Sequence, residues 1–220
     1  MRALALLAAL AVATPAHAER SPEVSDRTLF YVGLALAPPT YLVGVSLHEG
    51  SHALAAELLG GTVDEVHLFP PGRDPRSGRF RFGWVYTRGL RTRAQKTLFL
   101  SAPKLTDAAL LGGFAALAFT DGWPDSRWGG LALTVLATGL WVDYAKDVFL
   151  FHGGNDVVKT FKLWGLTGWR QVPARLVYAA SIVGLGVILA KGYQRTFRTF
   201  QDRGISARTP KLVPIASFVF

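Results

Sequence analysis

The chain has 220 residues, of which 50% are hydrophobic and 18% are charged, and its formal net charge is +9. This composition is too apolar for an ordinary soluble domain and is typical of a small polytopic membrane protein with one domain. The basic residues lie mostly between apolar segments, where the positive-inside rule and anionic headgroups account for them, so we expect no nucleic-acid partner. Because cysteine is absent, disulfides and thiolate metal ligands are excluded, and only histidine and carboxylates can hold a metal ion.

Residues 1–18 have the pattern of a secretory signal peptide. Arg2 provides a positive start, residues 3–12 are apolar, and Ala16-His17-Ala18 is a small-x-small cleavage pattern. Cleavage after Ala18 is one interpretation, and an uncleaved signal anchor is the other. Both interpretations leave residues 19–28 on the exported side of the membrane, and neither makes His17 a metal ligand.

The next apolar segment covers about residues 28–59 and exceeds the ~20 residues that one membrane span requires. Pro38-Pro39 predict a break in this segment, because proline removes a helix hydrogen bond and clashes with the preceding turn. We therefore expect a short helix to about residue 37 and a second helix over residues 40–59. Gly60-Gly61 predict the end of the second helix.

The second of these helices contains an H-E-x-x-H motif, His48-Glu49-Gly50-Ser51-His52. On a helix, His48 and His52 project from one face and can hold one metal ion, for which Zn²⁺ is the expected choice. Glu49 is then placed to act as a general base on a water at the metal. Helix-packing histidines beside a glutamate are the structural alternative. Burying such groups in an apolar segment is costly without a partner, which favours the metal site.

Residues 62–88 predict a small β-hairpin at the membrane face. Residues 63–69 and 79–86 alternate in the manner of strands, and proline, glycine and aspartate between them favour turns. His67 lies on this hairpin, and we expect an interfacial histidine there rather than a ligand.

Three more apolar segments follow, at residues 97–119, 129–151 and about 172–190. The chain is therefore expected to be mainly α-helical, with about four membrane segments in one domain that spans residues 28–190. A polar turn at residues 152–156 closes the third segment, and a basic tail, residues 191–220, follows the fourth. With residues 19–28 exported, the positive-inside rule places the end of the motif helix and this turn on the same, cytoplasmic face. A spanning fourth segment would put the basic tail outside, so either that segment re-enters or the rule fails there.

A catalytic zinc site commonly has three protein ligands and one open position. Asp156 is the preferred third ligand, because Gly153-Gly154 form a flexible turn that could bring its carboxylate to the motif helix. Its structural alternative is a helix cap. The other candidates are carboxylates on the expected helices, with Asp143 and Asp107 ahead of Asp147 and Glu57.

This combination of features resembles the site-2 protease family of intramembrane zinc metalloproteases. The resemblance covers about residues 40–160 and depends on the H-E-x-x-H helix, the hairpin, the Ser101-Ala-Pro-Lys-Leu-Thr-Asp107 stretch and the Gly153-Gly-Asn-Asp156 turn. It implies a zinc site of His48, His52 and Asp156. Asp107 stands where the family has asparagine, Val157 stands where it has glycine, and no Asn-x-x-Pro precedes Asp156, which indicates a divergent member.

The sequence therefore predicts an intramembrane zinc metalloprotease of a bacterial inner or plasma membrane. Its expected partners are the lipid bilayer and a membrane protein substrate, which the hairpin could hold by strand addition. The alternative is a non-proteolytic membrane protein with a structural or regulatory zinc site. A transporter that uses Asp107, Asp143 and Asp147 as an ion path ranks last, because no internal repeat is visible.

Overall fold

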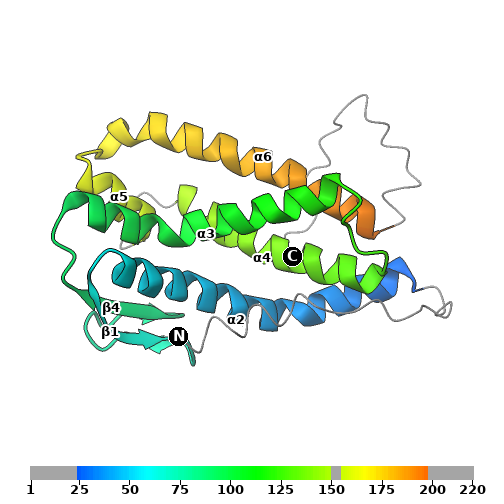
Figure 1. Cartoon of the computed structure of the whole chain (residues 1–220), viewed down its shortest axis with the longest axis horizontal. Coiled ribbons are helices and arrows are strands. Elements are labelled where there is room, and N and C mark those ends of the chain that lie inside the picture. Colours follow the sequence, from blue (N-terminus) through cyan, green and yellow to red (C-terminus); the bar gives the residue numbers. More distant parts are fainter. Residues whose placement is uncertain (1–23, 150–154, 198–220) are drawn as a thin grey trace.

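Four long helices carry the fold, and a small β-structure covers one end of them (Figure 1). The computed structural model describes residues 24–149 and 155–197. The expected signal peptide at 1–18 and most of the expected tail at 191–220 lie outside these residues, although Lys191 and Arg195 lie in the last helix. The four helices are α2 (Asp26–Leu58), α3 (Arg93–Phe119), α4 (Arg127–Lys146) and α6 (Val172–Thr196), and α4 packs against each of the other three.

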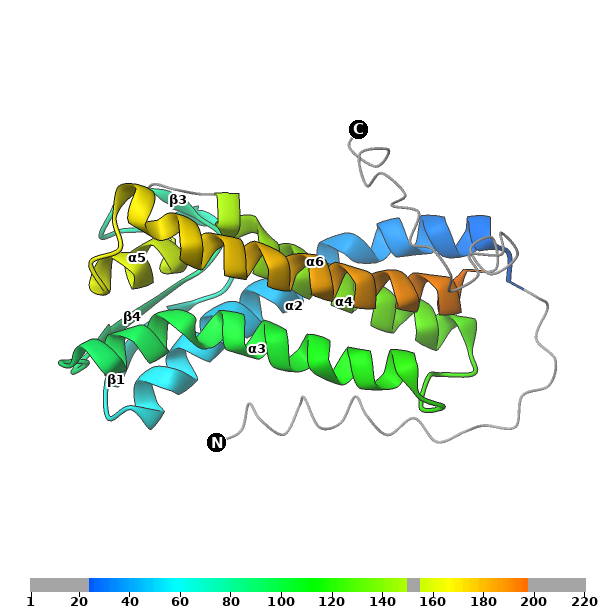
Figure 2. The same cartoon turned by 90° about the horizontal axis from the view of Figure 1, so that it is seen from above.

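Helix α2 is continuous, so the predicted break at Pro38-Pro39 is wrong. Both prolines lie inside the helix, and Figure 2 shows α2 bending between its first and second halves. A proline within a helix can be accommodated by a kink when neighbouring helices hold both halves, and α2 packs on α3 and α4. The Ser25 side chain caps the first turn by accepting from Thr28 N, and the helix ends before Gly60, whose φ is 78°.

Two short antiparallel strand pairs form the predicted β-structure. Strand β1 (Thr62–His67) pairs with β4 (Trp84–Arg88), and β2 (Gly72–Arg73) pairs with β3 (Phe80–Arg81). Both β1 and β4 contact α2. The hairpin is thus packed on α2, the helix that carries the motif, as the lower left part of Figure 1 shows.

The turn between β2 and β3 is organised by Asp74, whose residue surface is only 2% exposed. Its carboxylate accepts hydrogen bonds from the Ser77 hydroxyl, the Tyr86 hydroxyl and the backbone N–H of Arg76. The hydrogen bonds from Ser77 and Tyr86 hold the pKa of Asp74 well below its usual range, because they stabilise the ionised form. The carboxylate therefore stabilises the turn in its charged state.

A short helix that was not predicted follows the third long helix. Helix α5 (Asp156–Leu163) packs on α3, and Asn155 caps it by accepting a hydrogen bond from Val158 N at 2.8 Å. A 3-10 segment, η2 (Asp147–Phe149), precedes it, and another, η3 (Gly168–Gln171), leads into α6. Asparagine is a preferred N-cap residue, so Asn155 was the available sequence signal for this helix.

The apolar core lies where α3, α4 and α6 meet, around Leu111, Phe114 and Leu140. Among the described residues, two stretches are long and apolar enough to cross a membrane, Asp26–Leu58 and Gly168–Thr196. The second and third predicted apolar segments are helical as α3 and α4, but they do not meet this criterion. Both carry charged residues in their interiors, among them Lys104 on α3 and Asp143 on α4.

Candidate metal centre

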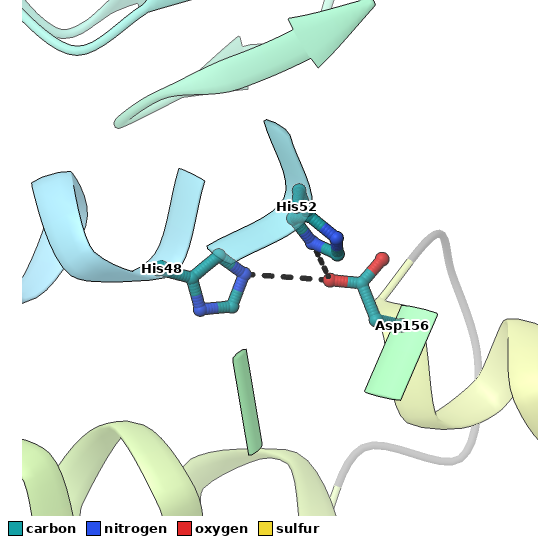
Figure 3. Close-up of side chains that lie close together, drawn as sticks. All are labelled: His48, His52 and Asp156. Atoms are coloured by element: carbon teal, nitrogen blue, oxygen red, sulfur yellow. Dashed lines mark hydrogen bonds and ion pairs between the residues drawn. The ribbon is translucent and has the colours of Figure 1, made fainter. Parts of the chain in front are cut away.

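Three side chains from two helices converge at the hairpin end of the bundle (Figure 3). His48 and His52 lie one turn apart on α2, and Asp156 is the first residue of α5. Their potential ligand atoms all lie within 4.8 Å of one another. The predicted pair of histidines and the preferred carboxylate are therefore brought to one point, although they are more than 100 residues apart in the sequence.

The distances from Asp156 to the two histidines suit a tetrahedral metal site. The Asp156 Oδ2 atom lies 3.0 Å from His52 Nε2 and 3.4 Å from His48 Nε2. Zinc bonds of about 2.0–2.1 Å at tetrahedral angles put neighbouring ligand atoms about 3.3 Å apart. Two imidazoles and one carboxylate are also a known ligand set for catalytic zinc, so the residues fit this metal.

The far nitrogen of each imidazole has a partner of its own. His52 Nδ1 donates to the Phe99 backbone carbonyl at 2.8 Å, and His48 Nδ1 donates to Asp143 Oδ2 at 3.1 Å. With a proton on Nδ1 of each ring, a bound metal ion would have both Nε2 lone pairs available to it. Such partners fix the tautomer and the ring orientation of metal-binding histidines.

The Asp156 carboxyl group is held in the ionised form that a metal ligand requires. Burial raises its pKa, but hydrogen bonds with His48 and His52 and the charge of Lys159 together lower this pKa well below its usual range. The Lys159 ammonium lies 2.9 Å from Asp156 Oδ1 and so occupies the oxygen that faces away from the histidines.

An open cavity of about 200 Å³ gives access to these residues. Glu49 lines it together with Arg81, Trp84 and Asn155. The chain between β3 and β4 passes directly over Glu49, because a Cβ atom at Gly83 would lie only 2.8 Å from Glu49 Cγ. Only glycine fits this close approach without a shift of its neighbours. The general base expected from the motif therefore lies between the metal-binding residues and the hairpin.

Asn155 is a polar group of the cavity that the sequence did not reveal. Its Oδ1 atom caps α5, which fixes the orientation of the amide and leaves Nδ2 as the free end. Nδ2 is buried and has no hydrogen-bond partner within the described part of the chain. Its position beside Asp156 was the only sequence signal for a place in the cavity, because the sequence did not predict helix α5.

A family model described as peptidase M50B-like matches residues 4–209. The chain belongs to the peptidase M50B-like family. This is a family of the site-2 protease type, so the resemblance seen in the sequence is confirmed, and a divergent member is consistent with the match. The family implies a membrane-associated metallopeptidase. No curated protein and no solved structure matches the chain.

The other candidate ligands of this M50B-like chain lie away from the point where the three side chains converge. Asp143 contacts the opposite nitrogen of the His48 ring, and Asp147 pairs with Lys104. Asp107 is buried beside Asp143, and Glu57 is exposed near the end of α2. Within residues 24–149 and 155–197, His48, His52 and Asp156 form the one group arranged to hold a metal ion.

His67, the remaining described histidine, belongs to the hairpin. Its ring stacks on Trp84 with the centroids 3.8 Å apart, and its Nε2 donates to the Pro70 carbonyl at 2.7 Å. His67 thus has a packing role next to the cavity wall, since Trp84 lines the cavity.

Proposed function

We propose that this chain is an intramembrane zinc metalloprotease that hydrolyses a peptide bond in a membrane-embedded or membrane-proximal segment of another protein. One observation carries the proposal: two imidazole Nε2 atoms and a carboxylate converge beside a cavity that Glu49 also lines. Membership of the peptidase M50B-like family supports the reaction class. The position of the motif on α2, an apolar helix long enough to span a membrane, supports an intramembrane site.

In this proposal His48, His52 and Asp156 hold the zinc ion. The bound ion would activate water and polarise the scissile carbonyl. Glu49 accepts the proton of the attacking water and then donates it to the leaving amine. Asn155 Nδ2, which is buried and unpartnered in the described structure, donates to the carbonyl oxygen as negative charge develops there.

The hairpin is the proposed holder of the substrate. β1 and β4 form a two-stranded sheet with exposed residues in β1, and the β3–β4 connection joins Arg81 to Trp84, which both line the cavity. An extended peptide added to a strand edge would have its backbone held by regular hydrogen bonds, whatever its side chains. We place the protein in a bacterial inner or plasma membrane as a multi-pass protein; the apolar helices and the family support the membrane location.

The proposal is tested by replacing Glu49 with glutamine in full-length protein in liposomes. The substrate probe is a library of single-span transmembrane peptides, and cleavage is detected as new peptide termini by mass spectrometry. Glu49→Gln is expected to lower the cleavage rate by about 10²–10⁴-fold with zinc still bound, because general base catalysis contributes about this factor. Glu57→Gln is the matched control, since Glu57 is an exposed residue of the same helix.

Cleavage by the Glu49→Gln variant at the wild-type rate would reject the mechanism. The departures from the family pattern at Asp107 and Val157 favour one competing function, a structural or regulatory zinc site without proteolysis. That function predicts stoichiometric zinc in the wild type, no cleavage of any library peptide, and no effect of Glu49→Gln on zinc content.

A further inference from the structure

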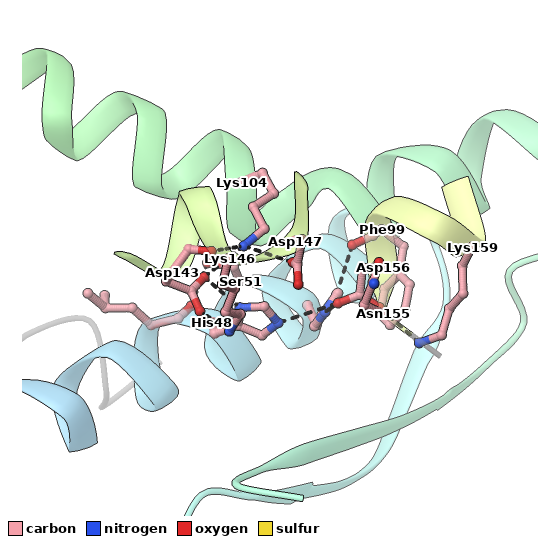
Figure 4. A network of polar contacts seen from close by, with 12 residues as sticks. His48, Ser51, Phe99, Lys104, Asp143, Lys146, Asp147, Asn155, Asp156 and Lys159 are labelled. Carbon is pink, nitrogen blue, oxygen red and sulfur yellow. Dashed lines mark hydrogen bonds and ion pairs between the residues drawn. The ribbon is translucent and has the colours of Figure 1, made fainter. Parts of the chain in front are cut away.

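A cluster of charged side chains lies beside the metal-binding histidines, at the junction of α2, α3 and α4 (Figure 4). Three of its members are almost fully buried, with exposed fractions of 8% for Lys104, 4% for Asp107 and 3% for Asp147. Charged groups in such surroundings are costly unless they are paired, and they are functional candidates when they lie in a membrane domain. The proposed hydrolysis of a peptide bond does not by itself require this cluster.

One member of the cluster reaches the metal-binding group. Asp143 Oδ2 lies 3.1 Å from His48 Nδ1, on the side of the ring away from Asp156. The corresponding atom of His52 is held by a neutral backbone carbonyl, that of Phe99, at 2.8 Å. The two histidines are therefore held differently: one by the fixed backbone of α3 and the other by a carboxylate on α4.

The Asp143 carboxylate is itself anchored on both oxygens. Oδ2 also accepts from the Lys104 ammonium at 3.0 Å, and Oδ1 accepts from the Lys146 ammonium. Lys104 donates as well to the backbone carbonyl of Asp143 and pairs with Asp147 at 3.1 Å. With both oxygens engaged, the carboxylate has a single orientation, and that orientation faces the His48 ring.

We propose that Asp143 is a positioning residue for the metal site: it fixes the tautomer and orientation of His48, and Lys104 and Lys146 fix Asp143. A carboxylate that accepts from the far nitrogen of a metal-binding histidine also raises the basicity of that ring, and loss of such a partner typically weakens metal binding 10- to 100-fold. The proposal also accounts for the buried Lys104, because its ammonium group holds the carboxylate that orients His48. The inference rests on the proposed metal site and does not require proteolysis.

This assignment differs from two roles that the sequence left open for Asp143. A third metal ligand would need its oxygen on the Nε2 side of the His48 ring, whereas the Asp143 oxygen lies at Nδ1. An ion path would need carboxylates free to bind the ion, whereas Asp143 and Asp147 both pair with the Lys104 ammonium. The geometry therefore points to a fixed support for His48.

The test is the zinc affinity of purified full-length protein, measured by competition with a chromophoric chelator. Asp143→Asn is expected to weaken zinc binding by about 10- to 100-fold. Asp147→Asn is the matched control, because it removes the other carboxylate paired with Lys104 but has no contact with His48. Its expected effect on zinc affinity is below about threefold, although both variants lose a comparable ion pair.

A second readout separates positioning from general destabilisation. In the Co²⁺-substituted protein, the ligand-field bands report the geometry at the metal, and only Asp143→Asn is expected to shift them. Asp143→Glu retains the negative charge that pairs with Lys104 and Lys146 but displaces the carboxylate by one methylene. It should therefore also weaken zinc binding, and it provides the test if Asp143→Asn fails to fold.

Equal losses of zinc affinity in Asp143→Asn and Asp147→Asn would overturn the inference, as would wild-type affinity in both Asp143 variants. A wild-type protein that binds no zinc would instead reject the proposed function itself. The two failures are thus distinguishable in one series of measurements.

Discussion

Charged groups are at least partly buried at both ends of the helical bundle, but among residues 24–149 and 155–197 a group of potential metal ligands lies beside a cavity only at the hairpin end. At the far end, the starts of α2 and α4 and the end of α6 lie together (Figures 1 and 2). There the Arg127 guanidinium donates to the Asp26 carboxylate and to the backbone carbonyls of Val24 and Thr196. At the hairpin end, His48 and His52 direct their Nε2 atoms to the same carboxylate oxygen beside a cavity.

The residue types alone do not show that the Arg127 cluster and the histidine group have different roles. A guanidinium whose donors are directed to carbonyls and a carboxylate ties helix ends together, and its contribution is to stability. The imidazoles are held at Nδ1 by Asp143 and Phe99, which leaves the other nitrogen for a ligand. In this molecule the binding site is marked by imidazoles that are hydrogen-bonded at one ring nitrogen and have the other nitrogen beside the cavity.

The comparison predicts its largest effect at Asp156. Replacing Asp156 with alanine removes one of three metal ligands, so zinc affinity should fall by more than the 10- to 100-fold expected for loss of a supporting residue. Zinc content by mass spectrometry and chelator competition measure this loss. Asp125→Ala, which removes the same charge from an exposed loop, is the control. Retention of zinc by Asp156→Ala would show that another group completes the site.

The second effect is expected at the far end of the bundle. Arg127→Met removes the guanidinium that donates to the Asp26 carboxylate and to the carbonyls of Val24 and Thr196, so the free energy of unfolding should fall by about 1–3 kcal/mol. Zinc affinity should stay within about twofold of wild type. Unfolding in detergent and the chelator assay provide the two measurements, with the exposed Arg91→Met as control. A joint loss of stability and zinc affinity would contradict the independence of the two ends.

The smallest effect is expected in the hairpin, where Asp74 closes a polar cluster outside the bundle. Hydrogen bonds from Ser77 and Tyr86 lower the pKa of Asp74 in the folded protein. The stabilisation is therefore fully present above the unfolded carboxyl pKa, about 4, and is lost as pH falls further through the lower folded value.

Amide exchange of Asp74 and Gly78, whose N–H groups bond across this turn, measures that effect. Asp74→Asn should exchange roughly a few-fold faster than wild type at pH 7. The ratio should approach one in strongly acidic solution, because the wild-type carboxyl is then also protonated. A ratio that is independent of pH would assign the effect to packing rather than to charge.

Local features of the sequence were sufficient for several parts of the molecule. The H-E-x-x-H spacing requires only helical geometry to place His48 and His52 on one face, and Gly60-Gly61 correctly predicted the end of that helix. Alternating residues and intervening turns predicted the antiparallel strands, because both signals are set by neighbours a few positions apart. The match to the peptidase M50B-like family extends over most of the chain and agrees with the resemblance.

The failures of prediction have a common physical origin in contacts between distant segments. Pro38-Pro39 predict a break locally, but packing of α2 on α3 and α4 maintains a bent continuous helix. Helix α5 is only eight residues long, too short to be stable alone, and it forms against α3 with Asn155 as its cap. Local propensity could therefore predict neither element correctly.

By itself, then, the sequence determined a membrane-compatible composition, a pair of histidines with an adjacent glutamate, and a family. Only the tertiary structure decided which of several carboxylates meets the histidines and which one supports them from behind. The sequence favoured Asp156 as the ligand but left Asp143 as an alternative, and packing places Asp143 at His48 Nδ1 and Asp156 at Nε2. The physical reason is that a helical motif fixes the positions of its own side chains, whereas the approach of a third residue depends on how separate helices pack.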